Sequence, residues 1–152
     1  MKIEIRKARR EEISVISFFQ IKMAKETEDI DLEKDVVFNG VTAVFDDESK
    51  GVYWVAEKGN EIIASMLMTP EWSDWRNKTV LWFQSVYVLK EYRGQGIFRL
   101  MYEKLAEIVN SDENIGGLRL YVDKRNVSAQ KVYEKLGMDG EHYRFFEWMK
   151  EF

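Results

Sequence analysis

The stretch that decides the fold is Val86-Tyr-Val-Leu-Lys-Glu-Tyr-Arg-Gly-Gln-Gly-Ile-Phe98. Its apolar first half is typical of a β-strand, and an amphipathic helical pattern begins directly after it. Gly94 and Gly96 allow a tight turn that presents backbone N–H groups, and the first turn of the helix adds N–H donors without an acceptor in the helix. Because this turn lies at the positive end of a helix dipole, it is suited to binding a phosphate group.

Patterns of strands and helices alternate on both sides of this stretch. Strands are predicted at residues 3–5, 52–56, 61–68, 80–88, 118–122 and 143–149. Helices are predicted at about residues 10–25, 31–45, 97–109 and 126–136. Asp31 is the expected N-cap of the second helix, Gly137 is the expected cap after the last one, and Pro70 is expected to end the third strand. The strand 80–88 is nearly continuously apolar, which predicts a central strand buried on both faces.

The composition excludes several classes of protein. The formal net charge is −4, whereas a dedicated nucleic-acid binder normally carries a basic field. There is no cysteine and a single histidine, His142, which excludes disulfides and multi-histidine metal centres. The N-terminus is charged, and no apolar run is long enough to cross a bilayer. We therefore expect a cytoplasmic protein with no metal, no membrane partner and no nucleic acid, folded as a single domain over residues 1–152.

Two motifs lie in the second half of the chain. The first is Arg93-Gly94-Gln95-Gly96-Ile97-Phe98, and the second is Asn126-x-x-Ala129-x-x-x-Tyr133 followed by Leu136-Gly137-Met138. With the element order β-α-α-β-β-β-α-β-α-β, these motifs resemble the GNAT family of N-acetyltransferases over essentially the whole chain. The chain departs from the family pattern at Phe98, where the family has a small residue. The resemblance implies an α+β single-domain fold, with a mixed, mostly antiparallel sheet of six to seven strands flanked by about four helices.

The resemblance also implies an acetyl-coenzyme A-dependent N-acetyltransferase that moves the acetyl group directly to a primary amine of a small molecule or peptide. The backbone around the glycine turn would hold the diphosphate, Arg93 would add a charge-assisted contact, and the pantetheine arm would pair with the end of the preceding strand. A backbone N–H of that strand would stabilise charge on the thioester oxygen. The residues expected to bind the coenzyme are Val86, Tyr87, Val88, Arg93, Gly94, Gln95, Gly96, Ile97, Phe98 and Asn126. For Asn126, helix capping is an equally good explanation.

Two residues are candidates for catalysis. Tyr133 would protonate the departing thiolate, because a phenol with a pKa of about 10 keeps its proton at neutral pH. The alternative, that Tyr133 only belongs to an apolar stripe with Val132 and Leu136, is less favoured once the second motif is present. Gln84 interrupts the apolar strand where some family members carry a glutamate base; a glutamine can only orient a water or the acceptor. The base is left open, with carboxylates at Glu26, Glu28, Glu71 and Asp74.

Other features leave alternatives open. The stretch Trp72-Ser-Asp-Trp75 is either a wall of the acceptor site or a lid or dimer contact, and a homodimer through this loop or through the aromatic last strand is compatible with the sequence. His142 is expected on the surface of a strand or at an interface. Phe98 is expected to turn its ring towards the core or the adenine side without loss of binding. The main alternative to an enzyme is a module that binds or senses acyl-coenzyme A without catalysis.

Overall fold

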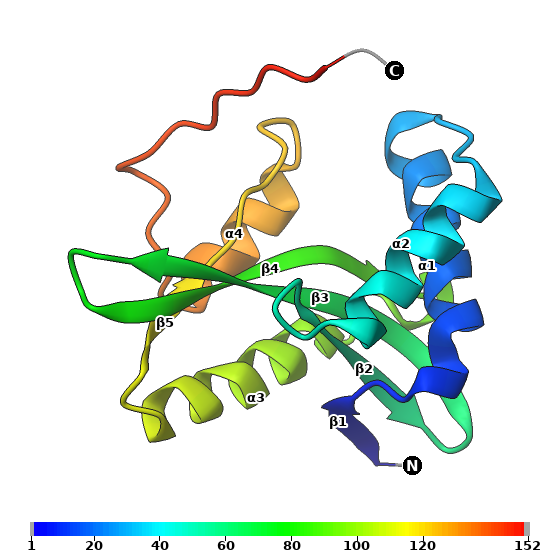
Figure 1. The fold of residues 1–152 in the computed structure, drawn as a ribbon, viewed down its shortest axis with the longest axis horizontal. Coiled ribbons are helices and arrows are strands. Elements are labelled where there is room, and N and C mark those ends of the chain that lie inside the picture. The colour runs from blue at the N-terminus through cyan, green and yellow to red at the C-terminus, as the bar shows by residue number, and fades with distance from the viewer. Residues whose placement is uncertain (1, 151–152) are drawn as a thin grey trace. The chain divides into compact units, whose positions relative to one another are not determined.

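Five strands form one sheet in the order β1-β2-β3-β4-β5 (Figure 1). Their bounds are Ile3–Lys7, Val52–Lys58, Glu61–Ser73, Lys78–Val88 and Ile115–Arg119. The first four strands pair antiparallel, and β5 pairs parallel to β4. The computed structural model describes residues 2–150, which form two compact units: one up to Arg119 and one from Leu120 onwards. The single-domain organisation stays a prediction.

Of the four α-helices in the described part of the chain, three belong to the first unit. These are α1 (Ile13–Glu28), α2 (Lys34–Asp46) and α3 (Ile97–Ser111), and the second unit contains α4 (Val127–Lys135). Short 3-10 turns, Arg10–Glu12 and Lys90–Tyr92, precede α1 and the glycine turn. Among the described residues, no helix combines the length and the apolar character needed to cross a bilayer.

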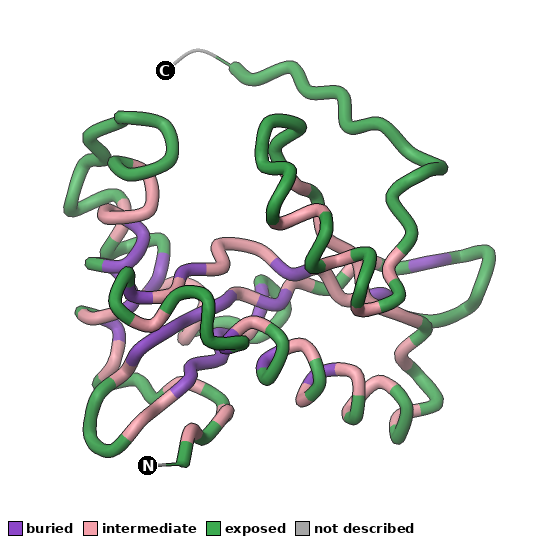
Figure 2. The backbone as a smooth tube through the Cα atoms, turned by 180° about the vertical axis from the view of Figure 1, so that it is seen from behind, coloured by how far each residue is buried: buried purple, intermediate pink, exposed green. Residues whose placement is uncertain are grey.

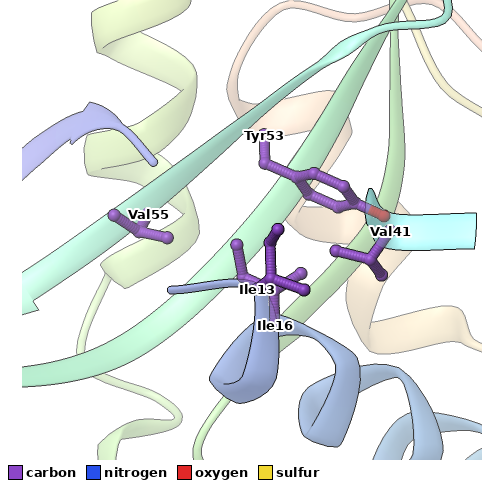
Figure 3. Close-up of a cluster of buried hydrophobic side chains, with 5 residues drawn as sticks. All are labelled: Ile13, Ile16, Val41, Tyr53 and Val55. Carbon is purple, nitrogen blue, oxygen red and sulfur yellow. The ribbon is translucent and has the colours of Figure 1, made fainter. Parts of the chain in front are cut away.

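The core of the first unit forms where α1 and α2 meet β2. Ile13 and Ile16 of α1, Val41 of α2, and Tyr53 and Val55 of β2 are buried together (Figure 3). Residues two apart in a strand share a face, so Trp54 and Ala56 lie on the opposite face, where they are also buried. Both faces of β2 are therefore covered. In β4, Val80 and Phe83 are three residues apart, so they lie on opposite faces, and both are buried. The predicted burial of both faces is therefore found at these positions, although most other residues of β4 are only half-buried (Figure 2).

Several predicted boundaries shift because pairing between strands extends or shortens them. β3 does not end at Pro70 but continues to Ser73, opposite β4. Its pairing with β2 ends at Met68, so Pro70 lies where β3 has β4 as its sheet partner and a missing N–H is tolerated. β5 begins at Ile115 and includes Gly116 and Gly117, which were expected before it. Asp31 is not the cap of α2, because the helix begins at Lys34 after Glu33, and Asp31 instead pairs with Lys25.

The predicted last strand is wrong, and over the described residues 2–150 the sheet has five strands instead of six or seven. Residues 143–149 form no strand, and their large side chains are exposed, from 62% for Phe145 to 87% for Trp148 (Figure 2). The aromatic residues here occupy both alternating positions of the chain, as Phe145 and Phe146 show, so they do not define one apolar face. Strand propensity alone does not form a strand without a partner, and none of the described strands pairs with this segment.

Candidate functional site

The glycine turn has the backbone geometry that the sequence predicts. Gly94 and Gly96 have φ angles of 75° and 76°, which residues with a side chain rarely adopt. Gly96 is the N-cap of α3, and the first hydrogen bond of the helix runs from the Leu100 N–H to the Gly96 carbonyl at 3.1 Å. The N–H groups before Leu100 therefore start the helix without an acceptor four residues back. This is the arrangement in which a helix start binds a phosphate.

The β4 strand that leads into the turn has an open edge. Among the described residues, β4 pairs with β5 only over Thr79–Trp82. On the other side, Ser65 faces Tyr87 and Leu67 faces Gln84, so β4 holds one extra residue in a bulge, and Ser85 has a left-handed φ of 51°. The Leu89 N–H donates to Ile63 of β3 at 2.9 Å. Since N–H groups alternate in direction along a strand, the Val88 N–H points away from β3, towards the open edge.

Arg93 lies between the open edge and α1. Its Nε donates to the Val88 carbonyl at 2.8 Å, and its Nη2 is 3.3 Å from both carboxylate oxygens of Glu26. The centre of its guanidinium group is 5.3 Å from the centre of the Tyr87 ring, which packs on Phe19. The side chain of Arg93 is therefore directed to α1 and to the strand.

The same cluster shifts the acidity of Glu26 and Tyr87. The nearby Tyr87 hydroxyl, followed by the charge of Arg93, lowers the pKa of Glu26 despite some burial. Burial and the Glu26 carboxylate raise the pKa of Tyr87 to about 12. The hydroxyl and the carboxylate lie close together, but no hydrogen bond of normal geometry joins them. Glu26 is thus a carboxylate at neutral pH, which makes it a weak candidate for the base.

Gln84 is held in a fixed orientation. Its Nε2 donates to the Thr69 hydroxyl of β3 at 2.6 Å, and the amide oxygen is the acceptor of the side chain. Nothing in the sequence indicated Thr69, because the contact joins two strands. The signal for the bulge was only that Gln84 and Ser85 are polar within an apolar strand.

Phe98 packs into an aromatic cluster. This agrees with the expectation that its ring turns towards the core. Its ring is 5.5 Å from that of Phe83 in β4 and 6.4 Å from that of Tyr102 in α3. The Phe83 and Tyr102 rings are stacked at 5.9 Å. The effect of Phe98 on coenzyme binding stays a prediction.

Two of the predicted site residues belong to the second unit. Asn126 caps α4 by accepting from the Ala129 N–H at 3.1 Å. Burial raises the pKa of Tyr133, which lies in the second turn of α4. Gly137 closes the helix as predicted, with a φ of 91° and hydrogen bonds from Gly137 to Glu134 and from Met138 to Tyr133. The structure thus brings together Gln84, the end of β4, the glycine turn and Glu26 within the first unit, and it describes Asn126 and Tyr133 within the second.

The remaining candidates have other partners or are exposed. Glu71 is paired with Arg119, and His142 is 2.9 Å from Asp139. Trp72 lies in β3 and Trp75 in the turn after it, and Trp75 is 90% exposed. Glu28 and Asp74 are exposed. Among the described residues, no group of three or more histidine, aspartate and glutamate side chains could hold a metal ion.

Comparison with known proteins identifies the relatives of this chain. The model of the acetyltransferase (GNAT) family matches residues 13–138. A structure described as a possible acetyltransferase from Clostridium difficile 630 is 44% identical, and the match covers 100% of both chains with a TM-score of 0.91. A predicted acetyltransferase from Clostridium acetobutylicum, solved with acetyl-CoA, shares the fold at 24% identity and a TM-score of 0.72, with 96% of each chain covered.

A curated relative gives a shorter match. The thialysine N-epsilon-acetyltransferase of Bos taurus is 36% identical over 66 residues, which is 43% of this chain and 38% of that protein. The matched region is therefore well under half of the bovine protein. Because the family model spans both motifs, α1 to α3 and the sheet from β2 to β5, the chain belongs to the acetyltransferase (GNAT) family.

Proposed function

We propose that this protein is an acetyl-coenzyme A-dependent N-acetyltransferase that moves the acetyl group directly to a primary amine. The observation that carries the proposal is the open edge of β4 leading into the left-handed Gly94 and Gly96. The open edge offers hydrogen bonds to a chain of amides, and the glycine turn offers N–H groups to a diphosphate. Coenzyme A contains both groups in one molecule.

The residues of the site have distinct tasks in this reaction. Bound acetyl-coenzyme A would supply the acetyl group as a thioester. The Val88 N–H, on the open edge, would hydrogen-bond the thioester oxygen and stabilise its growing negative charge. The acceptor amine attacks the thioester carbon, so that a C–N bond forms and the C–S bond breaks. Tyr133 would donate its phenolic proton to the departing sulfur.

The amine must lose a proton before or during its attack, and neither Gln84 nor Glu26 is well suited to take it. Gln84 cannot act as a base, and the lowered pKa of Glu26 makes that carboxylate weakly basic. We propose that the amide oxygen of Gln84, oriented by Thr69, holds the acceptor or a water that carries the proton away.

The acceptor class is suggested by the charge and by a relative. The name of the bovine relative specifies the side-chain amine of an amino acid. The net charge of −4 is favourable for cationic acceptors. We therefore propose a primary alkylamine, either a small molecule or a peptide side chain.

A thiol-release assay tests the function. The protein is incubated with acetyl-coenzyme A and a panel of lysine analogues, polyamines, aminoglycosides and peptides, and free thiol is measured. Release that depends on one class of amine supports the proposal. Because neither Gln84 nor Glu26 is a suitable base, one second candidate is a non-catalytic module that binds acyl-coenzyme A. Thermal stabilisation by acetyl-coenzyme A with no thiol release from any amine would support that candidate.

A further inference from the structure

We propose that Arg93 and Glu26 are positioning residues that hold the open edge of β4 in place for the pantetheine arm of coenzyme A. In this role the Arg93 side chain does not bind the diphosphate, although it stands at the start of the glycine turn. The inference rests on the proposed function, because it concerns the same coenzyme site.

The first argument is that two of the three nitrogen atoms of the Arg93 guanidinium, Nε and Nη2, already have partners. Its Nε donates to the Val88 carbonyl at 2.8 Å, and its Nη2 lies 3.3 Å from each oxygen of Glu26. A planar guanidinium can join two acceptors in this way, whereas a lysine ammonium cannot reproduce the same fork. The side chain is only partly exposed, at 43%, and it also covers the Tyr87 ring.

The second argument concerns the residue that Arg93 holds. N–H and C=O of one residue point in the same direction in a strand, so the Val88 carbonyl lies on the same open edge as the Val88 N–H. No β5 residue pairs with β4 beyond Trp82 among the described strands, so β5 does not fix the main chain at Val88 from this side. The bond from Arg93 replaces that missing support.

The third argument is that Glu26 fixes Arg93 to a rigid element. Glu26 lies in the last turn of α1, 67 residues earlier in the chain, and α1 is anchored in the core by Ile13, Ile16 and Phe19. Phe19 also packs on Tyr87 at 5.2 Å. The position of the strand edge is thereby set by the packing of α1 and not by the loop alone.

Two probes separate this role from a diphosphate contact. Coenzyme A contains both the diphosphate and the pantetheine arm, whereas adenosine 3′-phosphate 5′-diphosphate contains the diphosphate without the arm. Calorimetry with both probes is carried out on the wild type, Arg93→Gln, Arg93→Lys and Glu26→Gln. The matched control is Asp46→Asn, which removes another carboxylate paired with an arginine, Arg10, at 2.7 Å and outside the site.

We expect each of the three site variants to weaken coenzyme A binding about fivefold, the worth of about one hydrogen bond, and to change binding of the nucleotide by less than about twofold. Arg93→Lys should not restore coenzyme A binding, because a lysine ammonium cannot reach both the Val88 carbonyl and Glu26. Combining Arg93→Gln with Glu26→Gln should add little to either single change, because both break the same link. Asp46→Asn should bind both probes as the wild type does. Circular dichroism confirms that each variant is folded, and Glu26→Gln tests the proposal if Arg93→Gln does not fold.

Other results would overturn the inference. If Arg93→Gln weakens both probes equally, lysine restores them and Glu26→Gln binds as well as or better than the wild type, Arg93 is a diphosphate ligand. If Glu26→Gln leaves both affinities unchanged, Glu26 does not position the edge. If the wild type binds neither probe, the proposed function itself is wrong, and the inference falls with it.

Discussion

At the scale of single residues, Tyr133 is the residue whose proposed catalytic role is most open to test. Its ring is half-buried, and this burial raises the pKa of the phenol, so the phenol stays protonated through the neutral range. An acid of this kind assists only when negative charge develops on the leaving sulfur.

We expect Tyr133→Phe to lower kcat by about 100-fold while binding of coenzyme A stays within about twofold, because only proton donation is removed. Steady-state kinetics with the identified amine and calorimetry with coenzyme A measure the two effects. Tyr143→Phe, which removes a hydroxyl from an exposed tyrosine, is the control. Turnover unchanged in Tyr133→Phe would remove this residue from the mechanism.

Phe98 is a second residue with a clear expectation, because its ring packs against Phe83 and Tyr102. Removing it should cost stability by loss of aromatic packing and leave the coenzyme site open. We expect Phe98→Ala to lower the free energy of unfolding by about 2 kcal/mol, and to change the coenzyme A affinity less than about threefold. Denaturant unfolding and calorimetry check this. A large gain in affinity would show instead that the ring obstructs the site.

At the scale of elements, the start of α3 depends on a backbone conformation rather than on a side chain. A Cβ at Gly96, or at Gly40 inside α2, would meet no atom within 4 Å apart from the neighbouring residues and the backbone of the same helix. The two glycines differ in backbone conformation, because Gly96 has a φ of 76° and Gly40 does not have a positive φ.

The two alanine variants should therefore have opposite effects. Gly96→Ala should destabilise the protein by about 1 kcal/mol and weaken coenzyme A binding, since it strains the turn. Gly40→Ala should stabilise the protein by about 0.5–1 kcal/mol through the better helix propensity of alanine. Thermal unfolding of both variants gives the sign of each change. Equal changes in stability for Gly96→Ala and Gly40→Ala would show that the fold does not require the left-handed conformation at Gly96.

The sequence predicted those elements whose signals are local. The helix starts at Gly96 and Asn126 and the stop at Gly137 follow from residues within a few positions, and all three are confirmed. The left-handed Ser85, the Gln84–Thr69 bond and the Arg93–Glu26 pair were not predicted, because each depends on residues from another part of the sheet or on α1. The prediction of a last strand at residues 143–149 is wrong for the same reason. Strand pairing depends on distant parts of the chain, and aromatic content does not determine it.

At the scale of the whole molecule, the exposed aromatic tail is the feature that a single chain does not explain, although Phe145 stacks on Tyr121 at 4.9 Å. Tyr143, Phe145, Phe146, Trp148 and Met149 are all at least 62% exposed. A soluble monomer rarely presents so many neighbouring large apolar side chains to water, and such surfaces commonly mark contacts between proteins. We propose that residues 143–149 form the contact of a homodimer.

The dimer can be tested by introducing charge into the tail. We expect light scattering after gel filtration to give twice the chain mass for the wild type and one chain mass for Phe146→Glu combined with Trp148→Glu, because desolvating two carboxylates opposes association. Phe18→Glu changes an exposed aromatic residue of α1 and should leave the dimer intact, whereas Trp75→Glu tests the turn after β3 as the contact. A monomeric wild type, or a dimer lost only in Trp75→Glu, would contradict the role of the tail.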